Sequence, residues 1–267
     1  MKFENTYVYN FEGAFRGLRN PLESWKKSDS VFGIDYLDSY CEKDWKMAAM
    51  YVDANEKYDY EKEYDKCYEA RKKYVNWLDK NGILKYQNDC IEYAFIGPKD
   101  LDLAHRMIKA GSSDRKFLRQ IGVSVDITAP LYWYKEFDTY KIGTVANSTS
   151  TMHKITSTSI TIDCFEIDDY EQNIADIDNH LQPLTIIQYC EELRKKYLET
   201  KDKRYWKELI RWLPEGWLQT RTFTCNYEVL RNIYFQRQHH KLSEWHKFCE
   251  WIESLPYATD LITYTGK

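Results

Sequence analysis

Residues 128–154, TAPLYWYKEFDTYKIGTVANSTSTMHK, combine an aromatic helical pattern with a polar, cationic ending. The pattern predicts a helix with Thr128 at its N-cap and Pro130 in its first turn, where a missing backbone N–H costs nothing. Gly143 ends the aromatic part, and a run of hydroxyl and amide side chains follows it. Hydroxyls, an imidazole and lysines are groups that bind an anionic ligand such as a phosphate. A Ser/Thr-rich turn without any ligand is the alternative.

The composition is that of a folded protein with a sizeable core, because 43% of the 267 residues are apolar and 16% are aromatic. Twenty-three tyrosines and nine tryptophans favour ligand pockets or subunit interfaces, since both side chains carry a polar tip on an apolar body. Neither an internal repeat nor a linker interrupts the sequence. We therefore predict a single domain over 1–267.

The charge and the cysteine pattern give no support to several classes of function. A formal net charge of −4 gives no sign of a surface for nucleic acid or an anionic membrane. The sequence has no apolar run of about eighteen residues and no signal-peptide core, so no membrane segment is expected. Seven scattered cysteines show no C-x-x-C pair and no Cys/His ligand spacing. No metal site is expected, and the reducing cytoplasm is the predicted compartment.

Local patterns predict a mixture of strands and long helices. Alternation indicates a strand over 1–12, and a helical pattern from about 31 to 80, ending at Asn81-Gly82, indicates an extended helical N-terminal part over about 13–90. Further helices are predicted at about 99–109, 168–200 (two helices meeting near Pro183), 202–212, 226–238 and 243–255, and strands at VSVDI (123–127) and LQTRTFTCN (218–226). This succession predicts an α/β (α+β) fold with a mixed or antiparallel sheet.

The familiar nucleotide and catalytic motifs are absent from the sequence. There is no G-x-G-x-x-G after a strand, no Walker A loop, no H-E-x-x-H and no G-x-S-x-G. The sequence therefore does not support a Rossmann-type site or a P-loop. If the protein binds a nucleotide, it does so with another architecture.

A second informative stretch, 213–245, contains a predicted strand that leads into a helix. Asn226 lies where the helix begins, so it either caps the helix or presents its amide to a ligand. Asn232 has poor propensity for a helix interior, which indicates a purpose other than packing. Arg237 carries a planar guanidinium group that can donate hydrogen bonds to a phosphate or to a uracil-like carbonyl.

The segment TRTFTCNYEVLRNIYFQR, preceded by Leu213-Pro214, resembles the C-terminal signature of the flavin-dependent thymidylate synthases. In that family a strand leads into a helix that begins at an asparagine and carries a second asparagine and an arginine at this spacing. The family also has an Arg-Gln pair, an Arg-His-Arg triplet and an Asn-Glu-x-Ser-x-Arg-Tyr run. The similar positions of this chain read Lys135-Glu136, Thr139-Tyr140-Lys141 and NSTSTMH over 147–153.

Several positions depart from the family pattern. Thr139 and Tyr140 replace the first arginine and the histidine of the triplet, and Met152 stands where an arginine is expected. Glu228 replaces an arginine two residues after the first asparagine. The resemblance covers roughly residues 100–255 and indicates a divergent branch of the family.

The resemblance implies a one-domain fold assembled as a homotetramer, with active sites built from several subunits. Such enzymes use FAD, reduced by NADPH, to transfer a one-carbon unit from methylenetetrahydrofolate to C5 of dUMP and to reduce it, giving dTMP. No cysteine nucleophile is needed, because the reduced flavin donates the hydride. A relative that transfers a hydroxymethyl group to dUMP would need nearly the same site.

The resemblance also assigns residues to ligands by their position. Lysines and arginines near both stretches, including Arg221, would make a basic pocket for a phosphate. The FAD positions are Thr139, Tyr140, Lys141, Asn226 and Asn232. The dUMP positions are Glu136, Lys141, Ser150, Thr151 and Arg237, of which Glu136 and Arg237 are the catalytic candidates.

Two other classes of function stay open. The altered triplet is compatible with a catalytically silent relative that keeps the fold as a nucleotide-binding or interaction protein. The aromatic composition is also compatible with a binder of single-stranded nucleic acid, whose affinity would depend strongly on salt.

Overall fold

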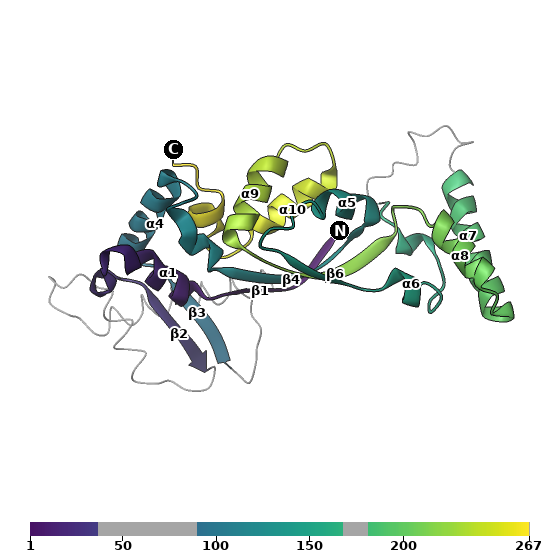
Figure 1. Ribbon diagram of the computed structural model, residues 1–267, viewed down its shortest axis with the longest axis horizontal. Coiled ribbons are helices and arrows are strands. Elements are labelled where there is room, and N and C mark those ends of the chain that lie inside the picture. The colour runs from purple at the N-terminus through teal and green to yellow at the C-terminus, as the bar shows by residue number, and fades with distance from the viewer. Residues whose placement is uncertain (37–89, 168–180, 267) are drawn as a thin grey trace, which may run out of the picture. The chain divides into compact units, whose positions relative to one another are not determined.

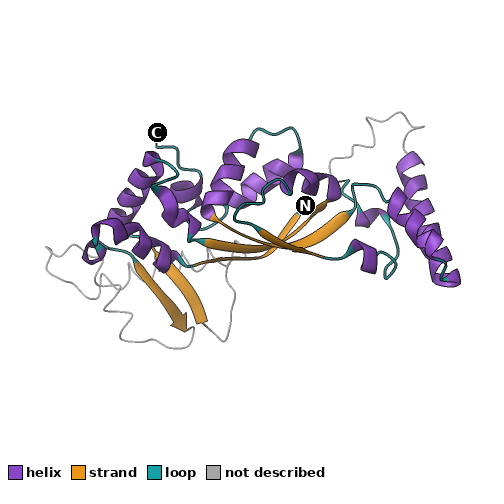
Figure 2. Ribbon diagram, in the orientation of Figure 1, coloured by secondary structure: helices purple, strands orange, loops and turns teal. Residues whose placement is uncertain are grey.

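The computed structural model describes residues 1–36, 90–167 and 181–266 (Figure 1). Within these ranges a four-stranded sheet has the order β1-β4-β6-β5, and a separate two-stranded sheet pairs β2 with β3 in antiparallel register. Helices occur between and after the strands, as Figure 2 shows by colour, which confirms the predicted mixture of helices and sheets. The strands are β1 Lys2–Tyr9, β2 Val31–Tyr36, β3 Cys90–Phe95, β4 Gly122–Pro130, β5 Val145–Ser148 and β6 Leu218–Asn226.

The α-helices of the described ranges agree with most of the predicted ones. They are α1 Phe11–Arg19, α4 Pro98–Ala110, α5 Leu131–Phe137, α6 Thr151–Lys154, α7 Leu181–Thr200, α8 Lys203–Trp212, α9 Tyr227–Arg237 and α10 Ser243–Glu253. None of the helices in the part of the chain that the structure describes is long and apolar enough to cross a membrane.

The chain forms two compact units. Unit 1 contains Met1–Phe3 and Asp126–Phe223, and unit 2 contains Glu4–Val125 and Thr224–Lys267. Strands β1, β4 and β6 contribute residues to both units. The single domain over 1–267 stays a prediction.

The aromatic helix α5 provides part of the core of unit 1. Its Trp133, Tyr134 and Phe137 are all buried. Phe137 stacks on Trp133 with ring centroids 4.5 Å apart and meets Phe223 of β6 edge-on at 4.6 Å. The aromatic pattern therefore exists to bury a face of this helix against the sheet, as ring pairs of this geometry do in cores.

The helix begins later than its sequence pattern predicts. Thr128 lies inside β4, where its hydroxyl is 2.7 Å from that of Thr220, so the predicted N-cap is wrong. Pro130 occupies the N-cap position with extended backbone (φ −71°, ψ 151°). The β-branched and apolar residues before Pro130 continue the strand, because cross-strand pairing supplies partners that a local helix pattern does not show.

Helices α7 and α8 form a hairpin around a second apolar cluster of unit 1, and they lie side by side in Figure 1. Asp202 caps α8 by accepting a hydrogen bond from the backbone N–H of Arg204 at 2.9 Å. Pro183 lies in the first turn of α7, and the helix predicted to precede it falls on residues 168–180, which lie outside the described ranges. The buried members of the cluster are Ile155, Ile160, Phe165, Cys190, Leu193 and Leu209.

In unit 2 the N-terminal part differs from its prediction. Residues Val31–Tyr36 form strand β2, paired with Cys90–Phe95, so the helix predicted to begin near 31 is wrong over those residues. The remainder of that prediction, including the stop at Asn81-Gly82, lies outside the described residues. The pairing joins two segments that lie more than fifty residues apart in the sequence. A local periodicity does not reveal such a partner.

A buried ion pair joins α1 to α4 in unit 2. Arg19 donates from Nε to Oδ1 of Asp100 at 2.5 Å, and the two residues are 5% and 0% exposed. The hydroxyls of Ser28 and Ser30 donate to the other carboxylate oxygen, each at 2.5 Å. Three donors therefore compensate one fully buried carboxylate, which would otherwise be costly to bury.

We predict that Arg19→Met lowers the free energy of unfolding by about 3–5 kcal/mol, because it leaves the buried Asp100 carboxylate without its cation. The double variant Arg19→Met/Asp100→Asn should recover part of that loss. Urea denaturation followed by circular dichroism measures both. The control is Arg106→Met, which removes an exposed ion pair with Asp102 and should change stability by less than about 1 kcal/mol. Equal effects of the two arginine variants would contradict the prediction.

Candidate functional site

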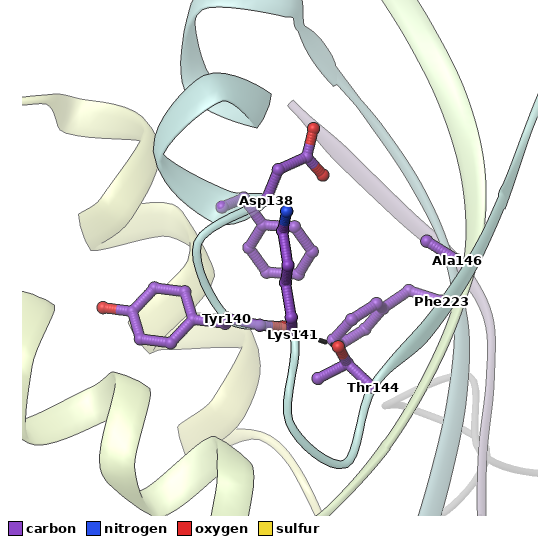
Figure 3. A pocket seen from close by; sticks show the side chains of 7 residues that line it. Asp138, Tyr140, Lys141, Thr144, Ala146 and Phe223 are labelled. Atoms are coloured by element: carbon purple, nitrogen blue, oxygen red, sulfur yellow. Dashed lines mark hydrogen bonds between the residues drawn. The ribbon is translucent and has the colours of Figure 1, made fainter.

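A pocket of about 290 Å³ in unit 1 brings together residues from the first predicted stretch. We call it the Lys141 pocket (Figure 3). Phe137 ends α5, the residues after it form the loop to β5, and Phe223 comes from β6. The lining combines aromatic rings with one acid and one cation, and it consists of Phe137, Asp138, Tyr140, Lys141, Thr144, Ala146 and Phe223.

The loop of the Lys141 pocket is held by its own hydrogen bonds. Thr139 donates from its hydroxyl to the carbonyl of Glu136 at 2.7 Å, and Thr144 does the same to the carbonyl of Tyr140 at 2.6 Å. Gly143 has φ 73°, a left-handed conformation that other residues adopt with strain. Helix α5 already ends at Phe137, so the predicted end of the helix at Gly143 is too late, and Gly143 lies within the loop.

Arg221 anchors this loop to strand β6. Its NH1 donates to Oδ1 of Asp138 at 2.7 Å, and its Nε donates to Oε1 of Gln219 at 2.9 Å. The guanidinium also lies 3.7 Å from the centroid of the Tyr134 ring. A planar cation stacked on an aromatic face and hydrogen-bonded at its edge is well fixed in orientation.

The same hydrogen-bond network extends to the start of α6. Gln219 donates from Nε2 to the carbonyl of Thr149 at 2.9 Å and to the hydroxyl of Thr151 at 3.2 Å. Ser150 is the N-cap of α6 and accepts from the backbone N–H of His153 at 3.3 Å. Thr151, one of the predicted dUMP positions, is therefore connected through Gln219 and Arg221 to Asp138 of the Lys141 pocket, and Ser150 precedes it in the chain.

Beneath this network the hydroxyl of Tyr134 is buried and donates to the carbonyl of Ile127 at 2.6 Å. Burial raises the pKa of the Tyr134 phenol far above its ordinary value, while the nearby Arg221 cation opposes that rise. Tyr134 is therefore a neutral donor at physiological pH. Its role is to support the arginine.

Three predicted site residues lie on or next to α9 in unit 2. Asn226 caps α9, because its side-chain oxygen accepts from the backbone N–H of Val229 at 3.0 Å, which confirms the capping interpretation. Asn232 is exposed on the helix. The guanidinium of Arg237 lies 4.5 Å from the centroid of the Trp245 ring.

Glu228, which departs from the family pattern, has a structural partner in unit 2. Its carboxylate is 5% exposed and accepts two hydrogen bonds from Arg115, at 2.8 and 3.1 Å. A bidentate pair of this kind fixes both side chains. The acid at position 228 thus ties the first turn of α9 to the 3₁₀-helix Arg115–Arg119.

The predicted residues fall into two groups. Within unit 1, Tyr140 and Lys141 line the Lys141 pocket, and Glu136 and Thr139 form the turn that precedes them. Ser150 and Thr151 also belong to unit 1, whereas Asn226, Asn232 and Arg237 belong to unit 2. The roles of all nine residues toward ligands stay predictions.

Sequence reasoning missed Asp138 and Gln219. Asp138 lines the Lys141 pocket, and Gln219 is 9% exposed although it is polar. The sequence did contain one signal for Gln219. In the predicted strand Gln219 and Arg221 are two residues apart, so both side chains point to the same face of the sheet. No local pattern indicated that Asp138, 83 positions from Arg221, is their partner.

The described residues do not include a metal-binding cluster or a reactive thiol at this pocket. No group of three or more His, Cys, Asp or Glu side chains in the described ranges is arranged to hold a metal ion. Burial raises the pKa of the Cys190 thiol to about 11, and burial together with nearby glutamates does the same for Cys249. Both thiols are therefore protonated at neutral pH, and neither lines the Lys141 pocket.

Comparison with known proteins gives a structural likeness without a sequence match. No protein-family model and no curated protein matches the chain. One similar structure is a crystal structure of thymidylate synthase X from Helicobacter pylori, solved with FAD and dUMP. The alignment covers 98% of this chain and 97% of that chain, with 13% sequence identity and a TM-score of 0.56. The chain has the fold of this enzyme. The likeness establishes the fold alone and confirms the predicted fold class.

A second structure is that of a flavin-dependent thymidylate synthase from Helicobacter pylori, complexed with FAD and dUMP. The two sequences are 16% identical, and the alignment covers 73% of this chain and 90% of that chain, with a TM-score of 0.47.

We predict that Asn226→Ala lowers the free energy of unfolding by about 1 kcal/mol, because it removes the cap of α9. Asn226→Asp should keep the stability, since a carboxylate accepts the same bond and is favourable at a helix N-terminus. Thermal denaturation at pH 7 measures both variants. An unchanged melting temperature for Asn226→Ala would show that the cap is not used.

Proposed function

We propose that the protein is a flavin-dependent thymidylate synthase or a close relative that acts on a pyrimidine deoxynucleotide. The observation that carries the proposal is the Lys141 pocket, in which aromatic rings and a lysine meet at the position of the family's triplet. The likeness to the fold of thymidylate synthase X supports this proposal.

The Lys141 pocket suits one ring system with an anionic group. Its volume of about 290 Å³ is just below the range of about 300–1,000 Å³ that is usual for ligand pockets. Phe137, Tyr140 and Phe223 offer apolar ring faces. No described side chain pairs with the exposed Lys141 ammonium, so it is available to a phosphate. FAD, which is larger, would need further residues for its other parts.

In the proposed reaction the flavin supplies the hydride, and the residues of the chain bind and orient the reactants. Lys141, Ser150 and Thr151 would hold anionic groups, and Glu136 would lie at the pyrimidine. In unit 2, Asn226 and Asn232 would contact FAD and Arg237 would hold the nucleotide. NADPH and methylenetetrahydrofolate are the proposed co-substrates, and a homotetramer is the proposed assembly.

A second candidate is a relative that binds the same ligands without turnover. The chemistry of the lining favours it, because Asp138, Tyr140 and Lys141 are the only titratable residues among those that line the described pocket, and Asp138 is paired with Arg221. The Thr139 hydroxyl is also engaged by the backbone of Glu136. Such a protein would keep flavin or nucleotide affinity and lack synthase activity.

Two measurements on the purified full-length protein separate these candidates. The first is the absorbance spectrum after addition of FAD and gel filtration, which shows whether flavin is retained. The second is tritium release from C5-labelled dUMP with methylenetetrahydrofolate and NADPH. Retained flavin with tritium release supports the enzyme, and retained flavin without release supports the silent relative. Loss of flavin with no release overturns the proposed function.

We also predict that Lys141→Ala weakens the binding of dUMP or FAD by about tenfold or more, because a charge-assisted hydrogen bond to phosphate is lost. Isothermal titration calorimetry at constant salt measures this change. Lys207→Ala is the matched control, since Lys207 is an exposed lysine of α8 in the same unit. Equal affinities for Lys141→Ala and the wild type would remove Lys141 from the site.

A further inference from the structure

Asp138 has one committed and one available carboxylate oxygen. Its Oδ1 accepts from NH1 of Arg221 at 2.7 Å, and no hydrogen bond in the ranges 1–36, 90–167 and 181–266 uses Oδ2. The side chain is 52% exposed and lines the Lys141 pocket (Figure 3). A carboxylate at neutral pH accepts hydrogen bonds and donates none. The pocket therefore presents a ligand with one unsatisfied, charged acceptor.

The orientation of this acceptor is set by Arg221, which is itself immobilised. The guanidinium is stacked on Tyr134 at 3.7 Å and bonded to Gln219 at 2.9 Å, so it holds Asp138 from a fixed position. A group held in this way selects ligands more sharply than a mobile one, because little side-chain freedom is lost on binding.

The remaining groups of the pocket limit what Asp138 can contact. A phosphate next to Asp138 would be repelled, and the cation that suits a phosphate is Lys141. The Thr144 hydroxyl is engaged with the carbonyl of Tyr140, and the other large side chains are aromatic rings. A flat ring seated against these rings would turn a polar edge toward Asp138. That edge must carry an N–H donor.

We propose that Asp138 is a specificity-determining residue that accepts a hydrogen bond from the imide N–H of a bound ring. This imide, an N–H between two carbonyls, is shared by uracil and by the flavin ring, and cytosine has no N–H at the equivalent nitrogen. The inference rests on the proposed function and deepens it, because it names the edge of the ligand ring that the Lys141 pocket would recognise.

The test compares ligands with and without the imide N–H on the full-length protein. Calorimetric titrations use dUMP against N3-methyl-dUMP, and FMN against 3-methyl-FMN. In the wild type, methylation should weaken binding of the ring that occupies the pocket by about tenfold or more, because a charged acceptor loses its partner. The pair that shows this loss identifies the ring as the pyrimidine or the flavin.

Two variants at Asp138 show that the discrimination comes from this residue. Asp138→Leu should weaken the unmethylated ligand and bring the ratio between methylated and unmethylated ligand near one. If the pyrimidine occupies the pocket, Asp138→Asn should shift preference from dUMP toward dCMP, because its amide can donate to the unprotonated ring nitrogen. Asp163→Asn, an exposed aspartate of unit 1 that does not line the pocket, should behave as the wild type. Thermal denaturation checks that each variant is folded.

The outcomes separate this inference from the proposed function. Binding of dUMP or FMN with equal affinity for the methylated ligands overturns the role of Asp138 and leaves the proposed function standing. A methylation effect that persists in Asp138→Leu also overturns it. If the wild type binds neither dUMP nor FMN, the role of Asp138 is overturned, and the proposed function falls with it when FAD is also not retained and no tritium is released. Discrimination in the nucleotide pair without any flavin binding keeps Asp138 and overturns the flavin chemistry.

Discussion

The stacking of Arg221 on Tyr134 is the interaction on which the site in unit 1 depends. One guanidinium, 3.7 Å from the ring centroid, is bonded at its edge to Gln219 and Asp138. Helix α5, strand β6 and the loop of the Lys141 pocket are therefore connected through a single cation. Such contacts are stronger where water is partly excluded, and the arginine side chain is 15% exposed.

The chemistry of the Lys141 pocket follows from how its charges are shared. Asp138 is balanced by Arg221, whereas no described side chain balances Lys141. A ligand with a neutral polar ring edge and a separate negative group matches this distribution. Next to these charges, Thr139 shapes the turn through a hydrogen bond to the carbonyl of Glu136, and Tyr140 adds a ring to the lining.

Several polar residues of unit 2 stabilise its helices. Asn226 caps α9, and Glu228 joins the first turn of that helix to Arg115. The buried Arg19–Asp100 pair holds α1 against α4. Glu228 thus has a structural explanation, because it forms a bidentate pair with Arg115. Ligand roles for Asn226 and Arg237 would be added to these contacts.

The sequence by itself determined the elements whose signals are local. Strand Leu218–Asn226 and helices α4, α8, α9 and α10 were predictable from alternation, periodicity and caps, and Lys141 and Tyr140 from a spaced motif. Only the tertiary structure decided the partners across the chain. It placed Thr128 in a strand, paired Val31–Tyr36 with Cys90–Phe95, and joined Asp138 to Arg221. The physical reason is that strand pairing and charge pairing are set by which distant segments become buried together, and no local pattern records that choice.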